Sequence, residues 1–312
     1  MPAPSPLPTS LPADATLTSW RAPDGWAHRR FDRPSAAGRG RILVQGGRSD
    51  VVEKYLGVID HLHRQGWSVT SFDWRGQGGS GRLGNHAGVG HADSFAAYAD
   101  DLAAFWADWQ AEGAGPHVLL GHSMGGHFAL ATLAAGRIRP DAVVLSAPMV
   151  AVRSPLGQRL GGWLARRIAG RGDPSRAAWE FSDESRAVER RRRRLTVDAS
   201  EGQDERWWEA DGTLRLGPPS WGWIAEAFRG AAAFERDPRL GAIDVPALFL
   251  IADHDQLVDP RAAHRVAAKM PDAKVVRFGR ESAHELLREG AAVRARAFAA
   301  IDTFLNERAP AA

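Results

Sequence analysis

The sequence predicts a doubly wound α/β fold, in which helices cover both faces of a mostly parallel sheet. Two observations predict it: short apolar runs recur along the chain, and segments with an apolar stripe at helical spacing separate them. The runs are continuously apolar instead of alternating, which is typical of strands buried on both faces of a parallel sheet. The predicted strands are residues 41–44, 68–72, 117–120, 142–145, 247–251 and 274–278.

Helices are predicted between these strands, and a hairpin is predicted before them. Two short runs, 20–21 and 26–32, flank the turn residues Pro23, Asp24 and Gly25, which predicts an antiparallel hairpin at the edge of the sheet. The predicted helices are residues 52–64, 95–112, 123–135, 261–269 and 291–306.

The regular alternation fails between residues 149 and 237, where tryptophans, arginines and Gly-Pro turns replace it. We expect this segment to be a helical cap inserted after the sixth strand, so that residues 16–148 and 238–312 form the core. Most of its tryptophans are expected to fill the cap's own small core, and one or two to line a substrate pocket. Residues 1–15 carry neither a basic first segment nor an apolar signal core, which predicts a disordered leader and a cytoplasmic protein.

Composition excludes several function classes. The 312-residue chain has no cysteine, which excludes disulfides, thiol chemistry and cysteine-bound metal. No window approaches the roughly 18–20 apolar residues that a membrane span requires. The net charge is only +3, and no aromatic residues interleave with the arginines as nucleic-acid binding would favour. The five arginines at 190–194 are interpreted as a solvated helix face, with peripheral contact to anionic lipid head groups as the alternative.

The most informative motif is Gly121-His122-Ser123-Met124-Gly125, which follows an apolar run and opens a small-residue helix. A Gly-x-Ser-x-Gly pattern between a strand and a helix predicts a nucleophile elbow. The serine of such a tight turn has a strained backbone, and glycines are needed where a side chain would collide with the neighbouring strand or helix. Ser123 is therefore the predicted nucleophile.

A serine nucleophile needs a histidine base and a carboxylate that orients the histidine, and after such an elbow they follow in the order Ser, Asp, His. The loop after the strand at 247–251 offers three acids. We select Asp255, because Asp259 before a proline is typical of a helix N-cap and Asp253 is expected to make local turn contacts.

The predicted base is His284, because it follows the final predicted strand. His254, which neighbours the selected acid, is the alternative. His122 and His127 are expected to be structural neighbours of the nucleophile. The sequence thus predicts a catalytic triad of Ser123, Asp255 and His284.

Two backbone N–H groups are expected to stabilise the oxyanion of an acyl-transfer reaction. They belong to Met124, which opens the helix after the nucleophile, and to Arg48, with Gly47 as the alternative. The glycines at 46 and 47 let the backbone approach the reacting carbonyl. The Arg48 side chain is expected to be incidental. Neither a cofactor nor a metal ion is expected.

Over about residues 40–310 the chain resembles the lysophospholipase and monoacylglycerol lipase group of α/β-hydrolases, which is related to the serine aminopeptidases of family S33. The resemblance rests on segments 47–55, 72–78 and 90–95, on the elbow, and on Asp255 and His284. It implies an α/β-hydrolase fold in which Asp73, Arg75, Gly76 and Gly78 shape a turn. Many members begin the oxyanion loop with His-Gly, where this chain has Gly46-Gly47.

These features predict a cofactor-independent serine hydrolase that cleaves carboxylic esters, with a lysophospholipid or a monoacylglycerol as substrate. A general carboxylesterase and an aminopeptidase are alternatives, and the latter needs cap carboxylates to bind the substrate ammonium. A non-catalytic ligand-binding homologue is the alternative outside enzymes. The oligomeric state is left open. Candidate ammonium ligands are Glu180, Asp183, Glu184, Glu209 and Asp211.

Overall fold

The computed structural model describes residues 10–86, 88–180, 196 and 203–311. Eight strands form one sheet in the order β1-β2-β4-β3-β5-β6-β7-β8. The first two strands form the predicted edge hairpin, β2 also pairs antiparallel with β4, and all other neighbours are parallel. The strands are β1 (Thr16–Arg21), β2 (Ala27–Arg33), β3 (Gly40–Gln45), β4 (Trp67–Phe72), β5 (His117–His122), β6 (Ala142–Ser146), β7 (Ala247–Ala252) and β8 (Ala273–Phe278).

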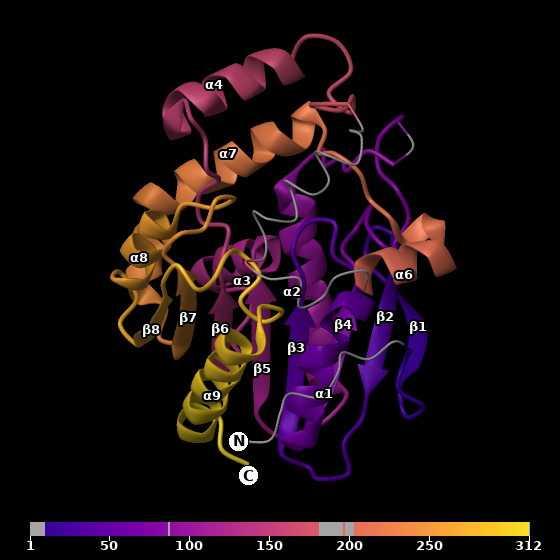
Figure 1. The fold of residues 1–312 in the computed structure, drawn as a ribbon, viewed down its shortest axis with the longest axis vertical. Coiled ribbons are helices and arrows are strands. Elements are labelled where there is room, and N and C mark those ends of the chain that lie inside the picture. Colours follow the sequence, from indigo (N-terminus) through magenta and orange to yellow (C-terminus); the bar gives the residue numbers. More distant parts are fainter. Residues whose placement is uncertain (1–9, 87, 181–195, 197–202, 312) are drawn as a thin grey trace.

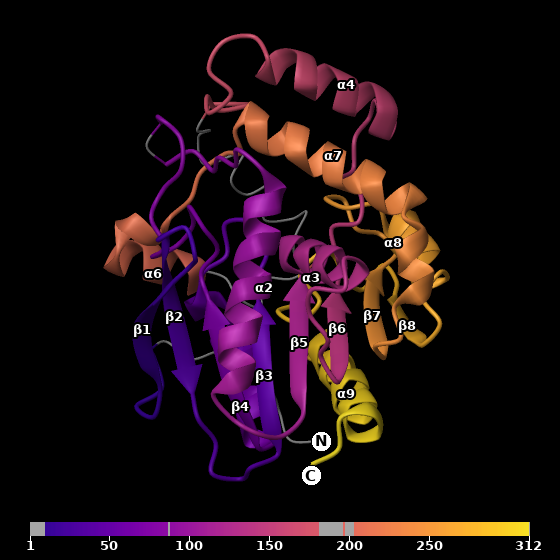
Figure 2. The ribbon, with the colours of Figure 1, turned by 180° about the vertical axis from the view of Figure 1, so that it is seen from behind.

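Helices cover both faces of this sheet, so the predicted fold class is confirmed. Two of them, α1 and α9, lie on the face seen in Figure 1, and α2, α3 and α8 lie on the face seen in Figure 2. Each predicted helix and each predicted strand of the parallel sheet agrees with the structure to within two residues, except that the first predicted helix begins as a 3-10 turn. The first strand of the hairpin, predicted at residues 20–21, begins four residues earlier, at Thr16. The helices are η1 (Val52–Tyr55), α1 (Leu56–Arg64), α2 (Phe95–Ala111), α3 (Met124–Ala134), α8 (Pro260–Ala267) and α9 (Ala291–Arg308).

Alternate side chains of the central strands enter opposite apolar layers, which explains why these strands are continuously apolar. In β3, Leu43 belongs to the layer that includes side chains of α2 and α3. Its neighbours Ile42 and Val44 belong to the layer that includes side chains of α1 and α9. All three side chains are completely buried.

The described part of the segment after β6 contains four helical elements, and a further 3-10 turn, η3 (Pro238–Ala242), leads back to β7. Figure 1 shows α7 across the carboxyl ends of the parallel strands and α4 on its outer side, and Figure 2 agrees. Side chains of α7, including Trp223 and Phe234, join the apolar layer of α2 and α3. The four elements are α4 (Gly157–Ala169), α6 (Gln203–Ala210), η2 (Gly212–Leu214) and α7 (Trp221–Arg236).

We expected most tryptophans of this segment to fill an interior, but several of them do not. Trp223 is buried, but Trp163 and Trp179 are about half exposed. In the predicted leader, Asp14 accepts a hydrogen bond of 2.9 Å from Arg33 of β2, and residues 1–9 lie outside the described residues. The arginine run at 190–194 lies outside them as well.

Candidate active site

Ser123 lies on the turn between β5 and α3 with φ 51° and ψ −113°, a left-handed backbone conformation that is strained for a side-chain-bearing residue. The flanking glycines have no room for a side chain. A Cβ on Gly121 would lie 2.8 Å from the carbonyl carbon of Gly125, and a Cβ on Gly125 would lie 2.5 Å from the Gln45 carbonyl oxygen. The structure thus contains the predicted elbow and its close approach to the end of β3.

The three residues of the predicted triad are brought together in one hydrogen-bonded chain. The Ser123 hydroxyl lies 2.9 Å from His284 Nε2, and His284 Nδ1 lies 2.6 Å from Asp255 Oδ2. All three side chains are buried. With Asp255 ionised, Nδ1–H donates to the carboxylate and Nε2 accepts from the serine hydroxyl, so the histidine can take the serine proton.

Backbone groups hold Asp255 in place for this contact. Its second oxygen, Oδ1, accepts hydrogen bonds from the N–H groups of Leu257 at 2.7 Å and Val258 at 3.0 Å. These two donors fix the orientation of the carboxylate, so that its other oxygen faces His284.

The neighbouring acids have other partners. Asp259 is the N-cap of α8, as predicted, and accepts from the Arg261 N–H at 2.9 Å. The expectation of local turn contacts for Asp253 was wrong: its carboxylate is 3.1 Å from His264 of α8 and accepts from Arg277 of β8 at 2.9 Å. Its partners lie 11 and 24 residues along the chain, so the packing of α8 and β8 and not the turn brings them to Asp253.

The alternative base, His254, is exposed and lines a cavity of about 710 Å³ between the start of α4, the loop after β7 and α8. Three arginines, Arg153, Arg261 and Arg277, line the same cavity. Arg153 also donates to the backbone carbonyl of Asp255. The geometry therefore favours His284 over His254 as the base.

The loop after β3 lies against the nucleophile, where an oxyanion-hole loop is expected. A Cβ on Gly47 would lie 3.1 Å from the Ser123 Cβ, so a glycine eases this close approach. The Gly47 N–H already donates to Asp50 Oδ2 at 2.6 Å, which favours Arg48 over Gly47 as the oxyanion donor. Met124 opens α3, where the first backbone N–H groups lack partners within the helix.

We expected the Arg48 side chain to be incidental, but the structure shows that it makes specific contacts. Its guanidinium donates to the Gly217 carbonyl oxygen and lies 5.4 Å from the ring centroid of Trp223. Both partners belong to the segment inserted between β6 and β7. Gly90 leaves room for the guanidinium, since a Cβ there would lie 2.6 Å from an Arg48 nitrogen, but no pattern in the sequence relates the two residues.

A buried cluster of charges beneath the site was missed by the sequence analysis. Lys54 forms an ion pair with Asp50 and a second one with Glu285 Oε1 at 2.8 Å. Asp50 also accepts from the Tyr55 hydroxyl at 2.6 Å, and Arg288 lies 2.5 Å from Glu285 Oε2. We call these five residues the charge cluster.

The charge cluster joins the two loops of the site. Asp50 accepts from the Gly47 N–H, and Glu285 directly follows His284. Burial opposes ionisation of Asp50, but the Lys54 charge overrides this effect and lowers the pKa of Asp50 to about 2. One signal was available in the sequence, because Lys54 is one of only three lysines in an arginine-rich chain and stands four residues after an acid.

The two histidines beside the nucleophile make structural contacts, as predicted. His127 Nδ1 lies 2.9 Å from the Met149 carbonyl oxygen, and His122 Nδ1 lies 3.2 Å from that of Ser146. Burial lowers the pKa of each to about 4, and for His122 the neighbouring His284 adds to the effect. Both rings are therefore neutral near pH 7.

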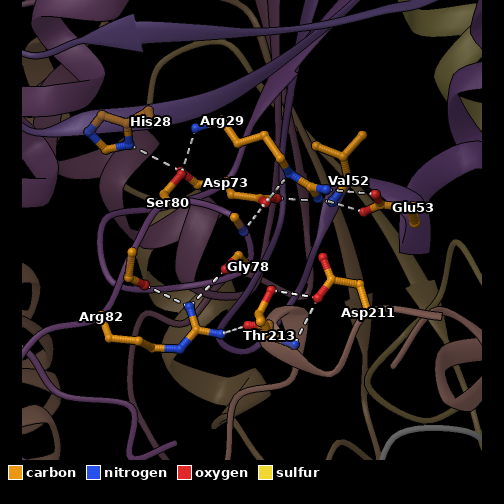
Figure 3. Close-up of polar contacts among 12 residues, drawn as sticks. His28, Arg29, Val52, Glu53, Asp73, Gly78, Ser80, Arg82, Asp211 and Thr213 are labelled. Atoms are coloured by element: carbon orange, nitrogen blue, oxygen red, sulfur yellow. Dashed lines mark hydrogen bonds and ion pairs between the residues drawn. The ribbon is translucent and has the colours of Figure 1, made fainter. Parts of the chain in front are cut away.

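The turn that follows β4 is held by buried polar groups, in agreement with the structural role that the resemblance implies for Asp73. Figure 3 shows Arg29 reaching both Asp73, at 2.7 Å, and Glu53, at 2.6 Å. The second Asp73 oxygen accepts from the Val52 N–H at 3.1 Å, at the start of η1. A Cβ on Gly78 would lie 2.2 Å from the Asp73 carboxylate, so this position requires glycine.

The candidate ammonium ligands do not converge where the structure describes them. Glu180 and Glu209 are exposed, and Asp211 caps η2 by accepting from the Thr213 N–H at 2.9 Å. Asp183 and Glu184 lie outside the described residues.

Comparison with known proteins finds a matching family profile and relatives that share most of the chain. The sequence matches the profile of the serine aminopeptidase S33 family over residues 36–291. Lysophospholipase L2 of Escherichia coli strain K12 is 32% identical over 301 residues, which cover 89% of this chain and 84% of that protein. Probable lysophospholipase L2 of Haemophilus influenzae is 26% identical over 291 residues, which cover 90% of this chain and 88% of that protein.

Solved structures show the same fold. A soluble variant of monoglyceride lipase from Saccharomyces cerevisiae, in complex with a substrate analog, superimposes with a TM-score of 0.76 at 19% identity and covers 99% of both chains. The monoacylglycerol lipase of Paleococcus ferrophilus superimposes with a TM-score of 0.65 at 20% identity, covering 89% of this chain and 98% of that one.

Proposed function

The chain belongs to the serine aminopeptidase S33 family of α/β-hydrolases, and from this premise we propose that it cleaves carboxylic esters of lipids through an acyl-enzyme formed on Ser123. The single observation that supports this mechanism most strongly is the continuous hydrogen-bonded chain from Ser123 through His284 to Asp255. An ester hydrolase acting on lipid substrates agrees with relatives named lysophospholipase and monoglyceride lipase.

In the proposed reaction the Ser123 oxygen attacks the ester carbonyl while its proton passes to His284 Nε2. Asp255 stabilises the resulting imidazolium through Nδ1. The negative oxygen of the tetrahedral intermediate accepts from the Met124 and Arg48 N–H groups, with Gly47 as the weaker candidate. His284 then protonates the leaving alcohol, and a water molecule that His284 activates releases the fatty acid.

The charge cluster is proposed to position the two loops that carry this chemistry. Lys54 lies between Asp50, which fixes the oxyanion loop at Gly47, and Glu285, which follows His284. The donors and the base must keep their geometry to within a fraction of an ångström for fast acyl transfer. A cation shared by the two loops provides such a constraint.

A lysophospholipid or a monoacylglycerol is the proposed substrate. An acyl chain gains about 0.8 kcal/mol for each CH₂ that it buries, so the enzyme needs apolar surface beyond what the sheet edge offers. We propose that residues 149–237 act as a cap that supplies this surface above Ser123. The aminopeptidase alternative has less support, since the described candidate ammonium ligands are exposed or occupied.

Two measurements test the proposal. A fluorophosphonate probe should label the wild-type protein and spare Ser123→Ala, and equal labelling of both would contradict the assignment of the nucleophile. Wild type should then be assayed against lysophospholipids, monoacylglycerols, p-nitrophenyl esters of increasing length and aminoacyl anilides. Faster hydrolysis of the anilides than of every ester would favour the aminopeptidase, and an equal rate on all chain lengths would contradict substrate selection by the cap.

A further inference from the structure

A cavity of about 710 Å³ lies between the start of α4, the loop after β7 and α8. Figures 1 and 2 show α8 beside β7 and β8, at the edge of the sheet. The volume of the cavity lies within the range of about 300–1,000 Å³ that is typical of sites for small organic molecules. Among the described residues that line it, none is Ser123, His284 or Met124. A molecule in this cavity is therefore separate from the reacting ester.

Three arginines from three different parts of the fold line this cavity, which we call the arginine cavity. Arg153 precedes α4, Arg261 lies in the first turn of α8, and Arg277 lies in β8. All three residues are exposed, so their guanidinium groups are accessible to a ligand. The planar guanidinium offers N–H donors in a geometry that matches the oxygens of a carboxylate or a phosphate. The lining therefore favours an anion.

The two acids of the lining do not cancel this charge. Asp253 forms an ion pair with Arg277 at 2.9 Å. Asp259 lies 3.9 Å from Arg265, which is not part of the lining. The other two arginines of the cavity form no ion pair with any residue that the structure describes, and one of them donates only to a backbone carbonyl oxygen. Two positive charges are thus left without a carboxylate partner.

These two charges and the size of the cavity indicate the class of ligand. A phosphate monoester carries a charge of about −1.5 to −2 near pH 7 and offers three strong acceptor oxygens. A carboxylate carries a single charge and matches the two free arginines less well. The cavity of about 710 Å³ also has room for an organic group attached to the phosphate. An organic phosphate monoester therefore satisfies both the charge and the volume.

The arginine cavity is connected to Asp255 of the candidate triad through its backbone. The Arg153 guanidinium donates to the Asp255 carbonyl oxygen, and the Arg153 N–H donates to the Leu257 carbonyl oxygen at 2.9 Å. Next to it, Val152 and Val258 form an antiparallel β-bridge. Leu257 and Val258 are the residues whose N–H groups hold the Asp255 carboxylate. A ligand that binds Arg153 thus acts on the segment that fixes the acid of the triad.

We propose that the arginine cavity is a binding site for an organic phosphate monoester, with Arg153, Arg261 and Arg277 donating to the phosphate oxygens. A guanidinium has five N–H donors, so Arg153 can hold the phosphate and the Asp255 carbonyl oxygen at the same time. The bound ligand restrains the segment that fixes Asp255. This site goes beyond the proposed function, because its ligand is neither the ester substrate nor a product of its hydrolysis.

Titration calorimetry of the full-length protein at constant ionic strength tests the site, with glycerol 3-phosphate as the probe. The probe should bind saturably, inorganic phosphate should bind more weakly, and uncharged glycerol should not bind. Arg261→Gln with Arg277→Gln should weaken binding about tenfold, because an exposed ion pair changes an affinity about fivefold or less. Arg261→Gln alone breaks no ion pair with a described residue, so it keeps the test valid if the double variant fails to fold, and it should weaken binding about threefold.

A matched control removes the same charge elsewhere. Arg64→Gln with Arg236→Gln replaces two exposed arginines, one of which is paired with an acid as Arg277 is, and should bind the probe like the wild type. Saturating probe should also slow amide hydrogen exchange over residues 253–259 and leave it unchanged in α1.

Several outcomes would overturn the proposal. They are the absence of saturable binding, equal weakening by the control pair, and unchanged exchange over residues 253–259 when the probe is bound. Competition of the probe with p-nitrophenyl butyrate would place the probe at the ester site instead. A higher KM of the Arg261→Gln, Arg277→Gln variant for a lysophospholipid, with an unchanged KM for a monoacylglycerol, would assign the cavity to the substrate's own phosphate and overturn a separate ligand. None of these results would affect the assignment of Ser123 as nucleophile.

Discussion

The charge cluster and the outer face of α4 are opposite exceptions to the usual rule that charged residues are exposed and apolar residues are buried. In the charge cluster, Lys54, Asp50 and Glu285 are buried and paired at the centre of the molecule. On α4, leucines and a tryptophan are exposed at its periphery. Neither arrangement is needed for stability alone. Apolar residues, for example, often replace buried ion pairs without loss of stability.

The comparison indicates that buried charges and exposed apolar residues meet different requirements. Buried charges give direction as well as contact, because an ion pair fixes the relative placement of the groups that carry it. Exposed apolar residues give affinity for an apolar phase and little direction. The first arrangement suits loops that must hold reacting atoms, and the second leaves an apolar surface at the periphery of the molecule.

The largest loss of activity is expected for substitutions in the candidate triad, and the smaller losses can be compared with it. His284→Ala should reduce kcat/KM for a short p-nitrophenyl ester by about 10⁴- to 10⁶-fold, because the proton acceptor is lost. Asp255→Asn should cost about 10⁴-fold through the wrong histidine tautomer. His254→Ala is the matched control and should retain wild-type activity; the opposite ranking of the two histidine variants would disprove the assigned base.

The next largest effect is expected for Lys54→Met, which removes the shared cation of the charge cluster. Two buried carboxylates then lose the cation that they share, while Arg288 still pairs with Glu285, so the free energy of unfolding should fall by about 3–5 kcal/mol. In the fraction that stays folded, kcat should fall by about 10- to 100-fold with little change in KM, because the loops shift. Urea unfolding and steady-state kinetics measure the two effects, and a variant that loses stability but keeps kcat would show that the cluster does not position the loops.

Acid should weaken the buried region while leaving α4 unaffected. The pKa of His127 is lowered from 6.5 to about 4 by burial, so the unfolded chain takes up a proton first as pH falls. Its contribution is complete above about pH 6.5 and is lost progressively down to about pH 4, by about 3 kcal/mol. His122 acts in the same direction.

His127→Asn should test this, because the amide can still donate to the Met149 carbonyl but does not titrate. Thermal unfolding of the variant should show a slope against pH between 6.5 and 4 that is about half that of the wild type, since His122 remains. An unchanged slope would mean that His127 is not the source of the acid sensitivity.

The smallest effect is expected for Lys274→Met, which makes the same substitution as Lys54→Met at an exposed ion pair. Lys274 pairs with Glu307, and both side chains are about half exposed. The free energy of unfolding should change by less than about 1 kcal/mol, and kcat should not change. Equal destabilisation by the two lysine variants would remove the distinction between buried and exposed charge on which the comparison depends.

Local patterns in the sequence predicted the sheet, and they selected three residues for a triad that the structure brings into hydrogen-bond contact. Continuous apolar runs are a direct consequence of burial on both faces, and the glycines of the elbow are required by contacts within a few residues. Asp255 and His284 could be selected because each follows a strand, and parallel strands end at the same edge of a sheet. These inferences need no knowledge of which loops touch.

The features that were missed depend on contacts between distant loops or on the direction in which a pattern points. Lys54 and Glu285 are 231 residues apart, and no local spacing relates them. The Arg48 side chain meets Gly217 across 169 residues. The leucines of α4 recur at helical spacing in the sequence, but periodicity defines a face of a helix and not what lies against that face.

Arg29 carries a consequence for where this hydrolase begins. The family profile starts at residue 36, whereas Arg29 belongs to the β1–β2 hairpin before that point. Its guanidinium forms ion pairs with Asp73 and Glu53, two buried carboxylates within the matched region. A chain trimmed to the family boundary would keep every residue of the triad and lose the counter-ion of its own interior. The segment that matches the family profile therefore does not contain all the ion-pair partners of its own interior.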